Sequence, residues 1–178
     1  MTIVIRQEQP EDYGITEQVV KSAFADMAFS DQTEHELVAR LRQSAEFVPE
    51  LSLVAVDQEH DEIIGHILLS KIKIVGDDDS VESLSLAPVS VLPEYQGQGI
   101  GRQLISESLH QASEHGYSSV VVMGHADYYP KFGFRKASEW GIKAPFEVED
   151  EAFMAMELCE HALERVSGIV EYSGAFFE

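Results

Sequence analysis

Residues 86–101 read Leu-Ala-Pro-Val-Ser-Val-Leu-Pro-Glu-Tyr-Gln-Gly-Gln-Gly-Ile-Gly, and this stretch decides the fold. An apolar, β-branched run ends at Val91, a turn with Pro93 follows, and a helical pattern begins after glycines at positions 97, 99 and 101. This order predicts a strand, a glycine loop and a helix start. Alternating glycines let backbone N–H groups turn inward, and the first helical turn adds unpaired N–H groups and the positive end of its dipole. Such a loop is suited to binding phosphate.

Spacing separates this loop from two other phosphate-binding motifs. A Walker loop closes its glycines with Gly-Lys-Ser/Thr, whereas this run closes with Gly-Arg-Gln. A dinucleotide fingerprint that starts at Gly97 needs its third glycine at the position of Arg102. Both motifs are therefore excluded. A glycine-rich turn without a ligand stays an alternative, because turns also select glycine.

A second informative stretch covers residues 124–134, Gly-His-Ala-Asp-Tyr-Tyr-Pro-Lys-Phe-Gly-Phe, after an apolar run at 119–123 that is typical of a buried strand. Alone, its aromatic side chains would be interpreted as core residues. Together, Gln96-x-x-Gly99-x-Gly101 and Tyr-x-x-x-Gly-Phe from Tyr129 resemble the motifs of the GNAT superfamily of N-acetyltransferases. Within it, the second stretch is similar to a bacterial branch of predicted acetyltransferases, and the tail at 168–176 fits that branch.

The resemblance implies a co-substrate, acetyl-coenzyme A (acetyl-CoA), and the residues that hold it. Its pyrophosphate would lie on the loop and helix start, against Gln96, Gly97, Gln98, Gly99, Ile100, Gly101 and Arg102. Its pantetheine arm would pair with the strand near Val89, Ser90 and Val91. Tyr129 would face the coenzyme sulfur and hydrogen-bond the departing thiolate. Since the pKa of tyrosine, about 10, exceeds that of a thiol, about 8.5, full proton transfer is unfavourable unless a helix start lowers the tyrosine pKa.

The general base is unassigned. Family members with a recognisable base often carry a glutamate eleven residues ahead of the signature's Gln/Arg, and that position here is Ser85. Glu82 lies an odd number of residues away, so a regular strand points it to the other face. A water chain relayed by backbone carbonyls, His125 and an acid from the early helices all stay open. His125 equally suits a histidine that only hydrogen-bonds a carbonyl beside a strand end.

Composition narrows the class of protein. A length of 178 residues, 44% of them hydrophobic, fits one domain over residues 1–178. The 32 acidic against 12 basic residues give a net charge of -20, which argues against nucleic acid and suits a cationic substrate, although acidity also serves solubility alone. No run approaches the roughly 18 apolar residues of a membrane helix and no leader precedes the first strand, so we expect a cytoplasmic protein with no membrane partner.

Three further local features bear on chemistry. Cys159 lies in an apolar run, which favours a buried structural thiol over a nucleophile. The run Gly-Asp-Asp-Asp-Ser at 76–80 lacks the alternating ligands of a calcium loop, so we expect no metal there. His66 lies inside an expected strand and is interpreted as a packed residue.

Periodicity predicts the order of the elements. Strands are expected at 2–6, 51–56, 63–75, 81–91 and 119–123. A first helix is expected to start in the turn at 9–12, and two more are expected at 33–44 and 100–115. The first helix should bury Ile15, Val19, Val20 and Phe24. Thr33 and Glu36 match a capping box for the second helix, and Gly116 should end the third.

These elements predict an α/β (α+β) fold of the GNAT type: a mixed, mostly antiparallel twisted sheet of six or seven strands with helices on both faces. By the resemblance, strands 81–91 and 119–123 run parallel and splay apart around the pantetheine arm. The loop at 25–32 would then contact the acceptor, while its acids, Asp26 and Asp31, also suit ordinary helix caps.

We therefore expect an acetyl-CoA-dependent N-acetyltransferase that moves the acetyl group directly to a primary amine. A catalytically silent acyl-CoA-binding sensor or regulatory module is the alternative, favoured by Ser85 and disfavoured by Tyr129. The acceptor stays open among a protein amine, a polyamine, an amino acid and an antibiotic, and the protein is expected to act as a monomer or homodimer.

Overall fold

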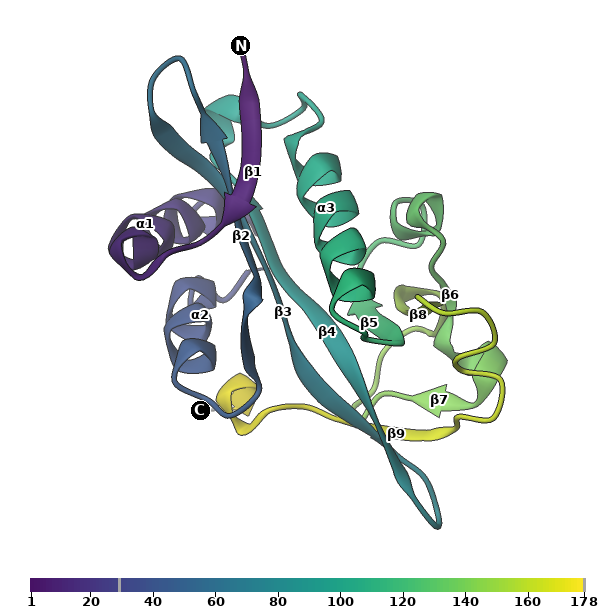
Figure 1. The fold of residues 1–178 in the computed structure, drawn as a ribbon. Helices are drawn as coiled ribbons and strands as arrows, with labels where there is room; N and C mark the ends of the chain where they lie inside the picture. The colour runs from purple at the N-terminus through teal and green to yellow at the C-terminus, as the bar shows by residue number, and fades with distance from the viewer. Residues whose placement is uncertain (29, 178) are drawn as a thin grey trace.

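The fold is a strongly twisted sheet with helices on both sides, as a computed structural model shows for residues 1–28 and 30–177 (Figure 1). The three α-helices of these described residues are α1 (Tyr13–Phe24), α2 (Glu34–Arg42) and α3 (Ile100–Glu114). The strands are β1 (Ile3–Gln7), β2 (Phe47–Asp57), β3 (Glu62–Val75), β4 (Ser80–Val91), β5 (Ser119–Met123), β6 (Arg135–Lys136), β7 (Ile142–Lys143), β8 (Phe153–Glu157) and β9 (Gly168–Glu171).

Within these residues the sheet has nine strands in the order β1-β2-β3-β4-β5-β8-β6, with β9 pairing β3 and β7. The mixed, mostly antiparallel architecture is confirmed. The strand number exceeds the predicted six or seven because β6 and β7 have two residues each, too short to produce a sequence period.

The parallel pair β4–β5 is short. Only Leu84–Val120 and Ser85–Val121 are in register, although β4 continues to Val91. β3 follows β4 on its other edge as far as the Gly65–Val91 pair. In the described chain, β4 beyond Ser85 therefore has a strand neighbour on one side only, as expected for strands that splay apart.

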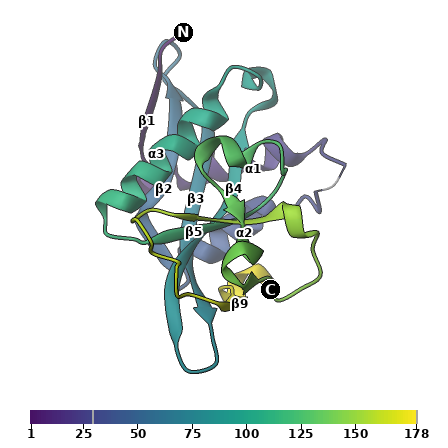
Figure 2. The same cartoon turned by 90° about the vertical axis from the view of Figure 1, so that its right-hand side faces the viewer.

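Helices cover the two faces of the sheet separately: α1 and α2 lie on one side of the central strands and α3 on the other (Figure 1). On the first side, Val20, Val38 and Leu41 pack with Leu68 of β3. On the second, Leu104, Ile105 and Leu109 of α3 belong to the largest core cluster, with residues of β2 to β5. The C-terminal segment runs from β9 to α2 (Figures 1 and 2), where Arg40 Nε donates to the Ala175 carbonyl at 2.9 Å.

Two predictions about α1 and α2 are wrong in detail. Ile15 is 54% exposed, because α1 begins at Tyr13 after a 3-10 turn and turns Thr16, Val19, Val20 and Ala23 inward instead. The capping box of α2 does not form: Thr33 is the N-cap, but its hydroxyl donates to Asp31 Oδ1 at 2.7 Å. The charged acceptor two residues earlier thus takes the Thr33 hydroxyl, which supports the capping interpretation of Asp31.

Two further expectations have opposite outcomes. Gly116 follows the C-cap of α3 with φ of +85°, which confirms its predicted role. Cys159 is exposed, which contradicts the prediction of a buried thiol, because β8 ends at Glu157 and the rest of the apolar run lies in a turn. No helix in the described part of the chain combines the length and apolarity needed to cross a membrane.

Candidate functional site

The glycine loop has the predicted local structure. After β4 a 3-10 turn (Pro93–Tyr95) leads to Gly97 and Gly99, with φ values of +78° and +83°. Gly99 is the N-cap of α3. A Cβ atom at either glycine would meet no protein atom within 4 Å, so both positions border open space rather than packed protein. Glycine is needed at these two positions because the backbone is left-handed there. It is not needed for packing, since no neighbouring protein atom would touch a Cβ.

Side chains fasten the two ends of this loop. Gln96 Nε2 donates to the Val91 carbonyl at 3.0 Å, which closes the loop onto the end of β4. Tyr95 Oη donates to Asp57 Oδ2 at 3.0 Å, and the same carboxylate receives the Glu59 N–H at 3.0 Å. A further bond joins Asp57 to His60 Nδ1, and this bond is the main cause that lowers the pKa of Asp57 and raises that of His60. The loop is thus anchored to β2.

A cavity of about 370 Å³ opens over the loop. It is lined by Val91, Tyr95, Gln96, Gly97, Gly99, Ile100, Gly101, Arg102 and Tyr128, and is called the loop cavity below. The first turn of α3 presents N–H groups without helical partners here, and the exposed Arg102 adds a positive charge. These features suit a bound anion such as a pyrophosphate.

The structure gathers most, but not all, of the predicted coenzyme residues at the loop cavity. Of these residues, Val89, Ser90, Gln98 and Tyr129 do not line it. Ser90 is 3% exposed, and its side chain has no hydrogen-bond partner within the described residues. Tyr95 and Tyr128 were missed as lining residues. The only sequence signal for them was an aromatic side chain close to a motif.

Tyr129 lies beside the end of β5, in an aromatic cluster. Its ring makes edge contacts with Phe134 and Tyr128, at centroid distances of 5.8 and 5.2 Å. A Cβ at Gly124 would lie 2.3 Å from its Cε2, so the ring occupies the space that only glycine leaves open. Burial, and then proximity to Tyr128, raise the pKa of Tyr129 to about 12. The pKa is therefore raised rather than lowered, although Tyr129 begins a short 3-10 helix.

His125 connects this cluster to the end of β5 through its backbone. Its carbonyl accepts hydrogen bonds from the Tyr128 and Tyr129 N–H groups, at 3.1 and 3.4 Å. The residue itself is exposed. His125 therefore helps to place both tyrosines, whatever its imidazole does.

A second cavity, of about 240 Å³, opens where the pairing of β4 with β5 ends. It is called the aromatic cavity and is lined by Ser85, Leu86, Ala87, Met123, Phe146, Tyr172, Phe176 and Phe177. Ser85 is 4% exposed, and burial raises the pKa of Tyr172 to about 12. Described residues of the loop at 25–32, expected to contact the acceptor, line neither this cavity nor the loop cavity; Phe29 is outside the described residues.

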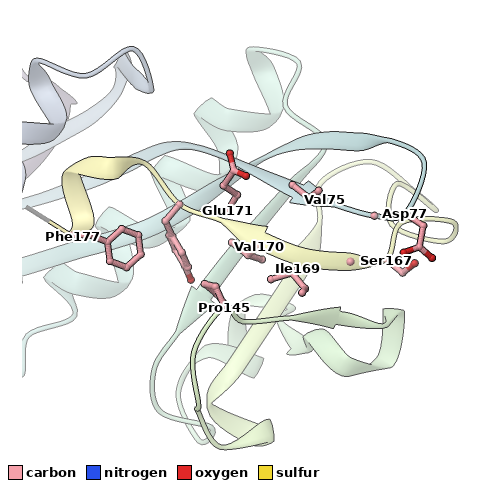
Figure 3. Close-up of a pocket in the computed structure, with 11 residues that line it drawn as sticks. Val75, Asp77, Pro145, Ser167, Ile169, Val170, Glu171 and Phe177 are labelled. Carbon is pink, nitrogen blue, oxygen red and sulfur yellow. The ribbon is translucent and has the colours of Figure 1, made fainter.

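A larger neighbouring hollow of about 600 Å³ shares Tyr172 and Phe177 with the aromatic cavity. Figure 3 shows Phe177 near one end of it and Asp77 and Ser167 near the other. Glu171 also lines it. On this side the aromatic cavity therefore has as its neighbour a surface that carries carboxylates.

Comparison with known proteins places the chain in a family. The family described as "Acetyltransferase (GNAT) domain" matches residues 49–136. The uncharacterized N-acetyltransferase YhbS of Escherichia coli K12 is 34% identical over 149 residues, which cover 84% of this chain and 86% of that protein. The uncharacterized N-acetyltransferase YjhQ of the same strain is 38% identical over 125 residues, 70% of this chain and 68% of that one.

Solved structures agree with the sequence relatives. The GNAT family N-acetyltransferase YhbS from Escherichia coli, crystallised in complex with CoA, matches with a TM-score of 0.87 and 31% identity, over 99% of this chain and 92% of that one. A GNAT family acetyltransferase from Brucella melitensis in complex with acetyl-CoA matches with a TM-score of 0.79 and 33% identity, over 98% of each chain. With such relatives along most of its length, the chain belongs to the GNAT family of N-acetyltransferases.

Proposed function

We propose that this protein binds acetyl-CoA along β4 and transfers its acetyl group directly to a primary amine. The observation that carries the proposal is the juxtaposition at β4: the loop cavity lies at its Val91 end, and its edge toward β5 has no strand partner in the described chain beyond Ser85. The crystal structures of relatives with CoA and with acetyl-CoA support the same ligand.

The loop holds the diphosphate end of the coenzyme in this proposal. Backbone N–H groups from Gly97 to Gly101 and the start of α3 bind the anion, and Arg102 supplies charge that solvent screens, because its side chain is exposed. The extended arm then adds to the free edge of β4 near Val89, Ser90 and Val91, as an added strand does. Because these contacts use the backbone, the buried side chain of Ser90 does not disqualify it.

Tyr129 is the proposed group that meets the departing sulfur. Its ring lies over Gly124, directly after β5, where the two strands have separated. With a pKa of about 12 against about 8.5 for an ordinary thiol, complete proton transfer would be uphill by about 5 kcal/mol. Tyr129 therefore acts as a hydrogen-bond donor to the developing thiolate rather than as a full proton donor.

Removal of a proton from the amine is assigned to no carboxylate, since Ser85 occupies the usual glutamate position. Ser85 lines the aromatic cavity, where the described lining residues include no ionisable acid or base other than Tyr172. Of the candidates considered from the sequence, His125 is retained because it lies between Met123 and Tyr128, two residues that line the two cavities. Water reached through backbone carbonyls is another route, and so is an acid from the early helices, although none of those described acids lines either cavity.

The test combines calorimetry with free-thiol release. We expect acetyl-CoA to bind and a pooled set of primary amines to stimulate thiol release. The alternative, a silent acyl-CoA-binding module, is favoured by Ser85; it predicts binding with no amine-stimulated release across a broad panel. Absence of binding would contradict both functions.

A further inference from the structure

We propose that the acceptor is a monoamine carried on an apolar group about the size of one ring, and that this group binds in the aromatic cavity. The inference rests on the proposed acetyl transfer and adds the chemical class of the acceptor. Its basis is the position, lining and size of the cavity lined by Ser85, Leu86, Ala87, Met123, Phe146, Tyr172, Phe176 and Phe177.

The aromatic cavity and the loop cavity lie along the same strand. β4 lines the aromatic cavity with residues 85–87 and the loop cavity with Val91. From Ala87 to Val91 the strand advances roughly 13 Å. The end of β5 and the segment that follows it also border the two cavities, through Met123 at the aromatic cavity and Tyr128 at the loop cavity. An arm that starts at the loop and follows β4 therefore ends beside the aromatic cavity, where an amine in that cavity can reach it.

The lining of the aromatic cavity disfavours an acceptor that carries several charges. Among the residues that the structure describes, the lining contains no Asp, Glu, Lys, Arg or His side chain, and its polar side-chain groups are the hydroxyls of Ser85 and Tyr172. An ammonium group moved into such surroundings without a counter-ion loses its hydration uncompensated, so a polyamine or an aminoglycoside binds poorly inside it. A single amine can instead enter as the neutral base, which is the form that attacks a thioester. This makes a carboxylate at Ser85 unnecessary for the amine to become neutral.

Carboxylates occur just outside the cavity. Asp77 and Glu171 line the neighbouring hollow, which shares Tyr172 and Phe177 with the aromatic cavity (Figure 3). Glu46 and Glu82, with Lys71 and Lys73, line another hollow at Tyr172. The acids can attract a protonated amine from solvent, and the apolar lining then favours its neutral form.

Size and shape favour a ring. The volume of about 240 Å³ exceeds the 150 Å³ or so of an apolar cavity that accepts benzene, and leaves space for a short amine arm. The cavity already contains ring contacts: Phe146 stacks on Tyr172 at 6.0 Å, and Tyr172 meets Phe176 at 5.2 Å. Another ring would extend this cluster with the same offset and tilted contacts.

The first experiment compares acceptors on the unmodified protein. Thiol release from saturating acetyl-CoA is measured with 2-phenylethylamine, with ethylamine as the matched amine without a ring, and with spermidine and a dipeptide. Because binding removes the apolar ring from water, kcat/KM should be at least about 10-fold higher for 2-phenylethylamine than for ethylamine. Spermidine or the dipeptide as the best substrate would leave acetyl transfer standing and overturn this inference. No turnover with any amine, with acetyl-CoA bound, would overturn both.

The second experiment changes the cavity. Met123 is 53% exposed at the end of β5, so Met123→Glu can add a carboxylate without burying it in the core. Ile15→Glu is the matched control, because Ile15 of α1 is 54% exposed and lines neither cavity. We expect Met123→Glu to lower kcat/KM for 2-phenylethylamine about 10-fold and to raise it for spermidine, while the acetyl-CoA dissociation constant and the melting temperature stay unchanged. The Ile15→Glu variant should match the unmodified protein. Equal behaviour of the two variants toward both amines would overturn the inference.

Discussion

The loop cavity and the aromatic cavity lie along one strand but are built in different ways. Eight of the nine residues around the loop cavity come from the continuous segment 91–102, and Tyr128 completes it. The aromatic cavity draws its lining from four separate parts of the chain: β4, the end of β5, Phe146 and the C-terminal segment. The first is proposed to bind through backbone N–H groups, whereas the second offers side-chain surface.

This difference separates two kinds of binding. A backbone site at a helix start depends on φ values, so few side-chain changes reach it. A cavity made of side chains from distant segments changes its chemistry with single substitutions. Variants of this protein should therefore alter coenzyme affinity and acceptor use independently. Substitutions at each cavity, and a change of pH, test that separation.

Tyr129→Phe should have the largest effect, because Tyr129 is proposed to act on the sulfur between the two cavities. The hydroxyl matters only once charge develops on the sulfur, so kcat should fall on the order of 10²-fold with the acetyl-CoA dissociation constant nearly unchanged. The phenyl ring preserves the packing over Gly124. Steady-state kinetics with saturating acetyl-CoA and a known acceptor make the measurement.

Tyr128→Phe is the internal control for this prediction. Tyr128 lines the loop cavity, so the loss of its hydroxyl should affect coenzyme binding modestly and turnover much less than the Tyr129 change. If Tyr129→Phe keeps full turnover and Tyr128→Phe loses it, Tyr128 rather than Tyr129 is the tyrosine that meets the sulfur. Full turnover in both would mean that neither tyrosine meets the sulfur.

Gly99→Val should weaken acetyl-CoA binding without changing the acceptor preference. At φ of +83° a side chain costs about 1–2 kcal/mol, and its Cβ enters the open space of the loop cavity. We expect a loss of about 30-fold in affinity by calorimetry. The matched control is Gly116→Val at the other end of α3, which has φ of +85° and open surroundings but lines neither cavity. It should lower the melting temperature similarly and leave affinity intact.

A folded Gly99→Val protein with unchanged acetyl-CoA affinity would remove the main support for coenzyme binding at the loop. Equal losses of affinity in the two valine variants would instead attribute the effect to α3 as a whole.

Arg102→Ala should have a smaller effect on the same cavity. The side chain is exposed, so its charge is screened, and acetyl-CoA affinity should fall about 3-fold near physiological salt and more at low ionic strength. Calorimetry at two salt concentrations tests this. Arg165→Ala, an exposed arginine outside both linings, should change neither value. A salt-independent loss would show that Arg102 acts by shape rather than charge.

The pH dependence should show the smallest effect. Because burial raises the pKa of Tyr129 to about 12, its protonated, donating form persists, and kcat should not fall from tyrosine ionisation below about pH 11. The raised pKa of Tyr129 also makes the free energy of unfolding depend on pH. Its stabilising contribution to the folded state is fully present below about pH 10 and is lost as the pH rises from there toward 12. A kcat limb near pH 9 that disappears in Tyr129→Phe would contradict this.

Local backbone chemistry was the part of the protein that could be predicted from sequence. Gly97, Gly99 and Gly116 were placed correctly because a left-handed φ selects glycine wherever it occurs. The strand, loop and helix around them were confirmed for the same reason. The failures were cases in which a distant or competing partner decided: Asp31 took the Thr33 hydroxyl, and the end of β8 left Cys159 in an exposed turn.

The coenzyme side of this protein thus follows from its linear order, because a glycine loop before a helix creates an anion site from consecutive N–H groups. The acceptor side does not. Met123, Phe146, Tyr172 and Phe177 carry no shared motif, and they meet because β4 and β5 stop pairing and the C-terminal segment returns past β3 to α2. Packing of segments far apart in the chain, which no local period encodes, makes the cavity apolar and sets its size.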